Sequence, residues 1–184
     1  MKNLILALLL FLSVKIIAQI DLPIDSITKR VVFTQIAQVD SLTQAEILAK
    51  ANEWIALNFT SAKDVVQLNN AETGKIIVKG NFTSYAHALI GSKILDYGIW
   101  KFTLVFEAKV SRYRISFTDL VHEHIYDRGS ASGGNIENLK PDCGNMHLTK
   151  KSWLELKMSA KTSIEKYLKD IKMYISQKKN NDKW

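Results

Sequence analysis

The sequence predicts a two-layer α+β domain in which one antiparallel sheet carries two helices on the same face. Several stretches alternate between apolar and polar residues and are joined by short polar connections, as antiparallel strands are. Two other segments place their apolar residues at helical spacing along one stripe. The expected order is strand, helix, four strands, helix. Because the sheet and both helices each have one apolar surface to bury, the helices should cover one sheet face.

Composition favours a single globular domain. The chain has 184 residues, of which 47% are hydrophobic and 23% are charged, and these values exclude a disordered or collagen-like protein. The one cysteine excludes an intramolecular disulfide framework and any metal site built from several cysteines. We expect the domain to occupy residues 20–177.

The first 19 residues have the features of a secretory signal peptide. Lys2 supplies a positive charge, and the apolar run LILALLLFLSV follows from Leu4 to Val14. This run is shorter than the roughly 20 apolar residues that span a bilayer. We predict cleavage near Ala18 or Gln19 and export of the mature chain; the alternative is an uncleaved anchor helix.

The first strand and the first helix follow directly. The stretch from Ile27 to Val39 is rich in β-branched residues and predicts a strand. Thr43 and Glu46 have the spacing of a capping box, so a helix should begin there and end near Asn58 to Thr60. Its buried stripe should contain Ile47, Leu48, Ala51, Trp54, Ile55 and Phe59.

The middle of the chain predicts a hairpin. A short strand over Asp64–Asn69 leads into a turn where Gly74 can take a positive φ. The next strand runs from Lys75 to Tyr85, and Ala86–Tyr97 is expected to be a loop, with room for one helical turn.

Two further strands show the clearest alternation. Gly98–Val110 turns its aromatic and aliphatic residues to one side, and Tyr113–Ile125 repeats the pattern. In the second of these strands the expected inward residues are Tyr113, Ile115, Phe117, Val121 and Ile125, and the expected outward residues are Arg114, Ser116, Thr118, His122 and His124.

The end of the chain predicts a long polar loop and a basic helix. Residues 126–150 form the loop, Ser152 and Glu155 have capping-box spacing, and the helix should run to Gln177 with Glu165 and Lys169 paired on its outer side. Residues 178–184 form a basic tail. The buried stripe should contain Trp153, Leu156, Ala160, Ile164, Leu168, Ile171 and Ile175.

The positive charge is concentrated in this last segment. The formal net charge is +7, and ten lysines face only four acidic residues from residue 150 onward. A uniformly basic nucleic-acid binder would have a different distribution. We expect four of these lysines to form a solvated face that makes weak contact with anionic membrane surfaces: Lys157, Lys161, Lys169 and Lys172.

Three stretches resemble one family of secreted bacterial proteins, a domain of unknown function with a TBP-like fold. They are Arg30–Phe59, Val65–Phe82 and Phe102–Glu123, the last with Arg112-Tyr113-Arg114 at its turn and Asp119 further along. The resemblance implies a curved antiparallel sheet with two helices on its back, in the periplasm or outside a Gram-negative cell. It implies no reaction. TBP itself binds DNA with such a sheet and inserts apolar wedges, but no phenylalanine pair can be placed on the outer face here, so we predict no nucleic-acid binding.

The outer sheet face is the predicted binding surface. Six residues are assigned to it: Lys79, Lys101, Arg112, Arg114, Thr118 and His122. The preferred interpretation is an exported, non-enzymatic domain that binds a protein, glycan or small-molecule partner there. One alternative is a small-ligand carrier with a pocket between the sheet and the C-terminal helix.

The other alternative is a histidine-based metal enzyme. His122 and His124, two residues apart on one strand, could meet a metal on one sheet face, but a third ligand is missing from the sequence nearby, and solvent-facing histidines are the simpler interpretation. Cys143 would need a base such as His122 or His147 to act as a nucleophile. Phosphate-binding, dinucleotide-binding and hydrolase motifs are absent, so no cofactor is predicted.

Overall fold

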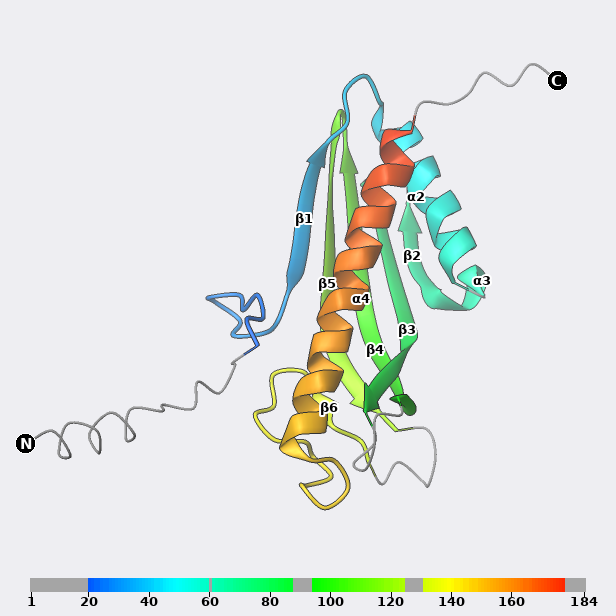
Figure 1. The fold of residues 1–184 in the computed structure, drawn as a ribbon. Helices are drawn as coiled ribbons and strands as arrows, with labels where there is room; N and C mark the ends of the chain where they lie inside the picture. Colours follow the sequence, from blue (N-terminus) through cyan, green and yellow to red (C-terminus); the bar gives the residue numbers. More distant parts are fainter. Residues whose placement is uncertain (1–19, 60, 88–93, 125–130, 178–184) are drawn as a thin grey trace, which may run out of the picture.

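The computed structural model describes residues 20–59, 61–87, 94–124 and 131–177, so the predicted signal peptide, the basic tail and Ile125 lie outside the described residues. One sheet forms the back layer and two long helices form the front layer (Figure 1). In chain order the elements are β1 (Phe33–Gln38), α2 (Gln44–Asn58), α3 (Ala62–Val65), β2 (Val66–Asn70), β3 (Lys75–His87), β4 (Ile94–Lys109), β5 (Arg112–Glu123), β6 (Gly134–Asn135) and α4 (Lys150–Ser176).

The sheet is antiparallel throughout its described pairings. Its strand order is β1-β5-β4-β3-β2, and the short β6 pairs with the far end of β5. β3 and β4 form a long antiparallel pair. β1, the first strand of the chain, pairs with β5 at one edge of the sheet. The predicted antiparallel α+β class, with a curved sheet and both helices on one face, is confirmed.

The core lies between the sheet and the helices. Trp54 on α2, Phe102 and Phe106 on β4, and Phe117 on β5 are buried as predicted, whereas Leu168 on α4 is only partly buried. Along α4 the buried residues of the predicted stripe are Trp153, Leu156, Ala160, Ile164, Ile171 and Ile175.

Local sequence signals fix both ends of α2. The Thr43 side chain accepts from the Glu46 backbone N–H, while the Glu46 carboxylate accepts from the Thr43 N–H at 2.8 Å. This reciprocal pair satisfies N–H groups that the first helical turn leaves without partners. The helix ends at Asn58, and Gly74 has φ of +65° in the turn that follows β2, both as predicted.

Five local predictions are wrong. The expected strand over Ile27–Val39 is shorter, because β1 spans only Phe33–Gln38 and the chain forms a turn at residues 26–28. Part of the expected strand over Asp64–Asn69 is the helical turn α3, and much of the expected loop over Ala86–Tyr97 belongs to β3 and β4, because these strands pair beyond the region of clear alternation. Thr149, not Ser152, caps α4, since its side chain accepts from the Ser152 N–H. Glu165 pairs with Lys161 on the preceding turn, its Oε1 3.9 Å from the lysine Nζ, not with Lys169.

A β-bulge changes the facing of the second half of β5. Thr103 of β4 pairs with Thr118, but Lys101 pairs with Val121, so one extra residue is inserted in β5. Asp119 sits at this bulge with φ of +53°. Since side chains alternate along a strand, one extra residue exchanges inward and outward positions beyond it. Leu120 and His122 are therefore buried, in contrast to the predicted outward position of His122.

Candidate functional site

The outer face of the sheet carries five of the six predicted binding residues. Lys79, Lys101, Arg112 and Arg114 are exposed there, and Thr118 is half-buried. Thr118 and Lys79 flank the same residue, Thr103, from the two sides, which places them in one row across three strands. His122 is excluded from this face by the bulge.

Ion pairs hold two of the basic side chains on the outer face. The Arg114 guanidinium donates through Nε to Glu107 Oε2 at 2.7 Å, and Nη2 of the same group approaches the same oxygen. Lys101 Nζ lies 2.6 Å from Glu123 Oε2. Lys79 and Arg112 form no ion pair with another described residue, so their charges are available to a partner.

An aliphatic strip crosses the same face. We use this name for Ile36 on β1, Val105 on β4, Ile77 on β3 and Leu68 on β2. Val105, Ile77 and Leu68 lie side by side in one register row on three neighbouring strands. Ile36 lies on the far side of β5, where it pairs with Arg114, and Val105 pairs with Ser116 of that strand. Ile36 is 66% exposed and Leu68 is 39% exposed, while the two central residues are half-buried.

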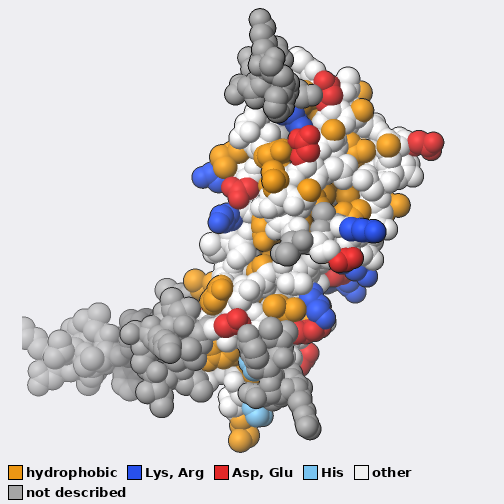
Figure 2. All heavy atoms as spheres, turned by 90° about the vertical axis from the view of Figure 1, so that its right-hand side faces the viewer, with side chains coloured by type: hydrophobic (Ala, Val, Ile, Leu, Met, Phe, Trp, Pro, Cys, Tyr) orange, Lys and Arg blue, Asp and Glu red, His pale blue; other side chains and the backbone are white. Residues whose placement is uncertain are grey.

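The side of the molecule that bears α2 and β2 has a mixed surface. Figure 2 shows Lys, Arg, Asp and Glu side chains scattered among hydrophobic ones, without a field of a single sign. Exposed hydrophobic residues that stand singly are normal on a soluble domain.

His122 is completely buried and both of its ring nitrogens are occupied. Nδ1 accepts from the Gly133 N–H at 3.0 Å, so the proton is on Nε2, which donates to the Tyr97 carbonyl at 2.9 Å. Burial disfavours the charged ring and lowers the pKa of His122 to about 4, although the contact with the Tyr97 carbonyl opposes the shift. His122 is thus a neutral, structural residue that ties β5 to the loop before α4.

Aromatic rings enclose this histidine. The ring centroid of Trp100 lies 5.2 Å from that of His122, and Trp153 stacks on Trp100 at 5.6 Å. A Cβ on Gly133 would come within 2.3 Å of the Trp153 ring, so the loop can approach the helix only with glycine at this position. The polar loop that the sequence predicted is therefore packed against the core in its described part.

Lys157 contradicts the prediction of a solvated lysine face. It is only 6% exposed, its Nζ donates to the Asn138 carbonyl at 2.6 Å, and it lies over the Trp153 ring at 5.0 Å. Burial lowers its pKa, and the nearby Glu137 carboxylate opposes that shift. Lys169 and Lys172 are exposed as predicted, and Lys161 is half-buried with its Nζ donating to the Asp21 carbonyl.

The described residues do not assemble the metal or cysteine chemistry considered above. Among them, no group of three or more His, Cys, Asp or Glu residues could hold a metal ion. His122 offers no ring nitrogen to a metal or to Cys143. Burial raises the pKa of the Cys143 thiol and the Asp142 carboxylate raises it further, which is the opposite of what activates a nucleophile.

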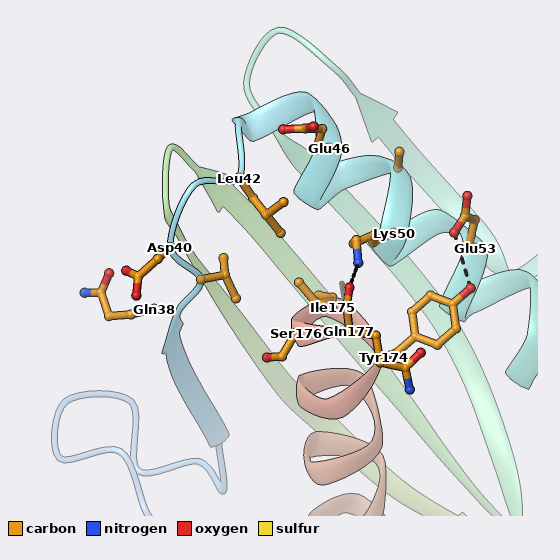
Figure 3. A pocket seen from close by; sticks show the side chains of 12 residues that line it. Gln38, Asp40, Leu42, Glu46, Lys50, Glu53, Tyr174, Ile175, Ser176 and Gln177 are labelled. Carbon is orange, nitrogen blue, oxygen red and sulfur yellow. Dashed lines mark hydrogen bonds between the residues drawn. The ribbon is translucent and has the colours of Figure 1, made fainter. Parts of the chain in front are cut away.

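A cavity of about 670 Å³ lies at the C-terminal end of α4 (Figure 3). It opens between α4, α2 and the end of β1, and three acidic side chains line it: Asp40, Glu46 and Glu53. Lys50 donates to the Gln177 carbonyl across it, and the Tyr174 hydroxyl donates to Glu53 at 3.3 Å. The middle of the sheet–helix interface, where a carrier pocket was considered, is filled by the buried stripe of α4.

Sequence reasoning missed Tyr167 and placed Lys157 on the wrong, solvated face. The Tyr167 ring lies within an aromatic cluster and stacks on Phe117 at 6.1 Å. It neighbours Leu168, which the helical stripe predicted instead. A wider apolar stripe that included position 167 would have found it.

The described helices include none that is long and apolar enough to cross a membrane.

Comparisons with known proteins confirm the predicted resemblance. Residues 33–123 match the family described as a domain of unknown function (DUF4468) with TBP-like fold. No curated protein matches the chain.

Two solved structures share the fold. A TBP-like protein from Parabacteroides distasonis is 15% identical and has a TM-score of 0.54; the match covers 80% of this chain and 94% of that one. A DUF4468 family protein from Bacteroides ovatus is 10% identical and has a TM-score of 0.58, with 83% of this chain and 90% of that one covered. At these identities the likeness shows the fold alone.

Proposed function

We propose that this TBP-like domain is an exported, non-enzymatic interaction module that binds a partner protein through the outer face of its sheet. The observation that carries the proposal is the aliphatic strip, which lies uncovered among ion pairs and basic side chains. An apolar centre within a polar rim is the anatomy of a protein–protein interface. The side opposite to the helices therefore offers a surface for a second protein.

Charge on this face indicates the chemistry of the partner. Lys79 and Arg112 are exposed and form no ion pair with a described residue, whereas the acidic groups Glu107 and Glu123 are already paired. A partner with an apolar ridge and flanking carboxylates would complement such a face.

Two observations support this proposal over its alternatives. Buried side chains of α4 fill the interface between this helix and the sheet, which favours an interaction domain over a carrier with a central pocket. All phenylalanines of the described residues belong to the core or pack against it, so none stands on the outer face as a wedge for DNA. Export rests on the signal-peptide features of residues 1–19.

The test is site-specific photo-cross-linking in the native cell envelope. A photoreactive amino acid at position 36 should give a discrete protein adduct, and the matched control is position 57, since Leu57 is 72% exposed on α2. The substitution Val105→Asp should abolish the adduct without lowering the amount of folded protein. Equal adducts at both positions, or none at position 36, would contradict the proposal.

A further inference from the structure

A second concave site lies at the opposite end of α4 from the cavity of Figure 3. It is a groove of about 650 Å³ between the N-terminal segment, the loop before α4 and the first turns of that helix. Its volume lies in the range of small-molecule sites. Its apolar walls are formed by Leu22, Ile24, Val31, Ile136, Leu139 and Leu154.

The groove is held open by internal bonds. Glu137 accepts from the Val31 N–H at 2.7 Å, which joins the N-terminal segment to the loop. The Asp25 carboxylate closes the turn after Ile24 by accepting from the Thr28 N–H at 2.7 Å. Lys161 fixes the start of the segment through the Asp21 carbonyl. The walls are therefore preformed, and a ligand need not order them.

The charged groups of the groove have an excess of positive sign. Four lysines line it, Lys29, Lys140, Lys150 and Lys157, against the single carboxylate of Glu137, which is already bonded to the backbone. Lys157 is the buried one. An ammonium has three N–H donors, and among the described residues the Asn138 carbonyl is the acceptor that Lys157 reaches. The ammonium also lies over the Trp153 ring and near the Glu137 carboxylate, but it forms no second hydrogen bond with a described residue.

Two wall residues are far more exposed than core residues. Ile24 is 62% exposed and Leu139 is 86% exposed, and both line the groove. Covering such large aliphatic side chains with an apolar chain is favourable, because it removes their apolar surface from water. The groove thus combines an uncovered apolar wall with a buried ammonium.

We propose that this groove binds a single-chain amphiphilic anion, a long-chain fatty carboxylate, with the alkyl chain between Ile24 and Leu139 and the carboxylate on Lys157. The two oxygens of a carboxylate can accept charge-assisted hydrogen bonds from the N–H groups of the Lys157 ammonium that the Asn138 carbonyl leaves unbonded. The groove is remote from the aliphatic strip, so this inference is independent of the function proposed for the outer sheet face.

The experiment is calorimetric titration of the purified, delipidated protein with dodecanoate below its micelle concentration, beside dodecanol and butanoate. We expect binding of dodecanoate, with dodecanol and butanoate each weaker by at least tenfold because one lacks the charge and the other the chain. Equal binding of dodecanol would overturn the contact with the ammonium. Binding to vesicles with anionic lipid, without binding of monomeric dodecanoate, would overturn the ligand and identify a membrane-docking surface instead.

Matched variants locate the site. Lys157→Met should weaken dodecanoate binding at least tenfold, whereas Lys172→Met, an exposed lysine on the same helix, should not change it. Leu139→Glu should also weaken binding at least tenfold, and Leu57→Glu, an exposed leucine on α2, should not. Because Leu139 is on the surface, its variant keeps the test valid if Lys157→Met fails to fold. Unchanged binding in the folded Leu139→Glu variant would overturn the proposal.

Discussion

The two faces of β5 use charged side chains in opposite ways. On the outer face, the Arg114 guanidinium is exposed and pairs with Glu107. On the inner face, His122 is neutral, because burial lowers its pKa to about 4. A shift of one position along the strand moves a side chain to the other sheet face. That shift decides whether a titratable group is a charged surface group or a neutral part of the core.

The same contrast holds for lysines. The side chain of Lys101 on the outer face is ion-paired and about half exposed. Lys157, a buried residue of α4, has a lowered pKa and donates to a backbone carbonyl. Pairing with water-exposed carboxylates contributes little to stability, but a buried polar group without its partner costs much more. Substitutions should therefore be costly on the inner face and nearly neutral on the outer one.

The largest expected effect is on the inner face. Phe106 is fully buried and stacks on Tyr113 at 5.1 Å. Phe106→Ala should lower the free energy of unfolding by about 3–5 kcal/mol, because it removes a large apolar side chain and leaves a cavity. Urea denaturation followed by circular dichroism measures this loss. The free energy of unfolding of the outer-face control Ile36→Ala should stay within about 0.5 kcal/mol of the parent value. Comparable losses in the two variants would show that the two sheet faces do not differ in this way.

A pH-dependent loss of stability should come next. The unfolded histidine has a pKa near 6.5 and His122 in the folded protein has one of about 4, so the unfolded state binds more protons between these values. The stabilisation from the neutral buried ring is fully present above pH 6.5 and should be lost as the pH falls toward 4. The expected contribution is about 3 kcal/mol over this window.

Denaturation series at several pH values separate this contribution from that of the carboxylates. The stability difference between the parent and His122→Gln should shrink by about 3 kcal/mol from pH 7 to pH 4. His147→Gln is the matched control, because His147 is exposed in the loop before α4 and its substitution should leave the profile unchanged. A constant difference between parent and His122→Gln across the range would show that His122 does not titrate as proposed.

The smallest effects should appear at the bulge that separates the two faces. Asp119 has φ of +53°, a conformation that β-branched residues avoid, so Asp119→Val should cost about 1–2 kcal/mol while Asp119→Gly should not incur this strain. Arg30 pairs with the Asp119 carboxylate at 2.6 Å, but both side chains are exposed, so Arg30→Ala should cost less than about 1 kcal/mol. Urea denaturation measures the loss of unfolding free energy in each variant. Equal losses in Arg30→Ala and Asp119→Val would show that the lost ion pair, and not the strained backbone at Asp119, accounts for the effect.

Local patterns in the sequence determine most of the architecture. The α2 capping box depends on two residues three positions apart, and the long alternation before Val110 depends on a period of two, so both can be recognised without any distant contact. The same holds for the outward position of Lys79 and Arg114, which lie in stretches without a bulge. Fold class, helix faces and most of the predicted outer surface follow from such short-range rules.

Tertiary structure alone decides the facing beyond Asp119 and the burial of Lys157. The bulge arises from the register between β4 and β5, which the sequence does not reveal. Simple alternation along the strand therefore predicts the wrong face for His122. Lys157 is buried because the loop before α4 folds back and brings the Asn138 carbonyl over the helix, a contact across 19 residues. Hydrophobic periodicity reports which residues prefer burial, whereas a buried histidine or lysine is stable only where a distant segment supplies its hydrogen-bond partner.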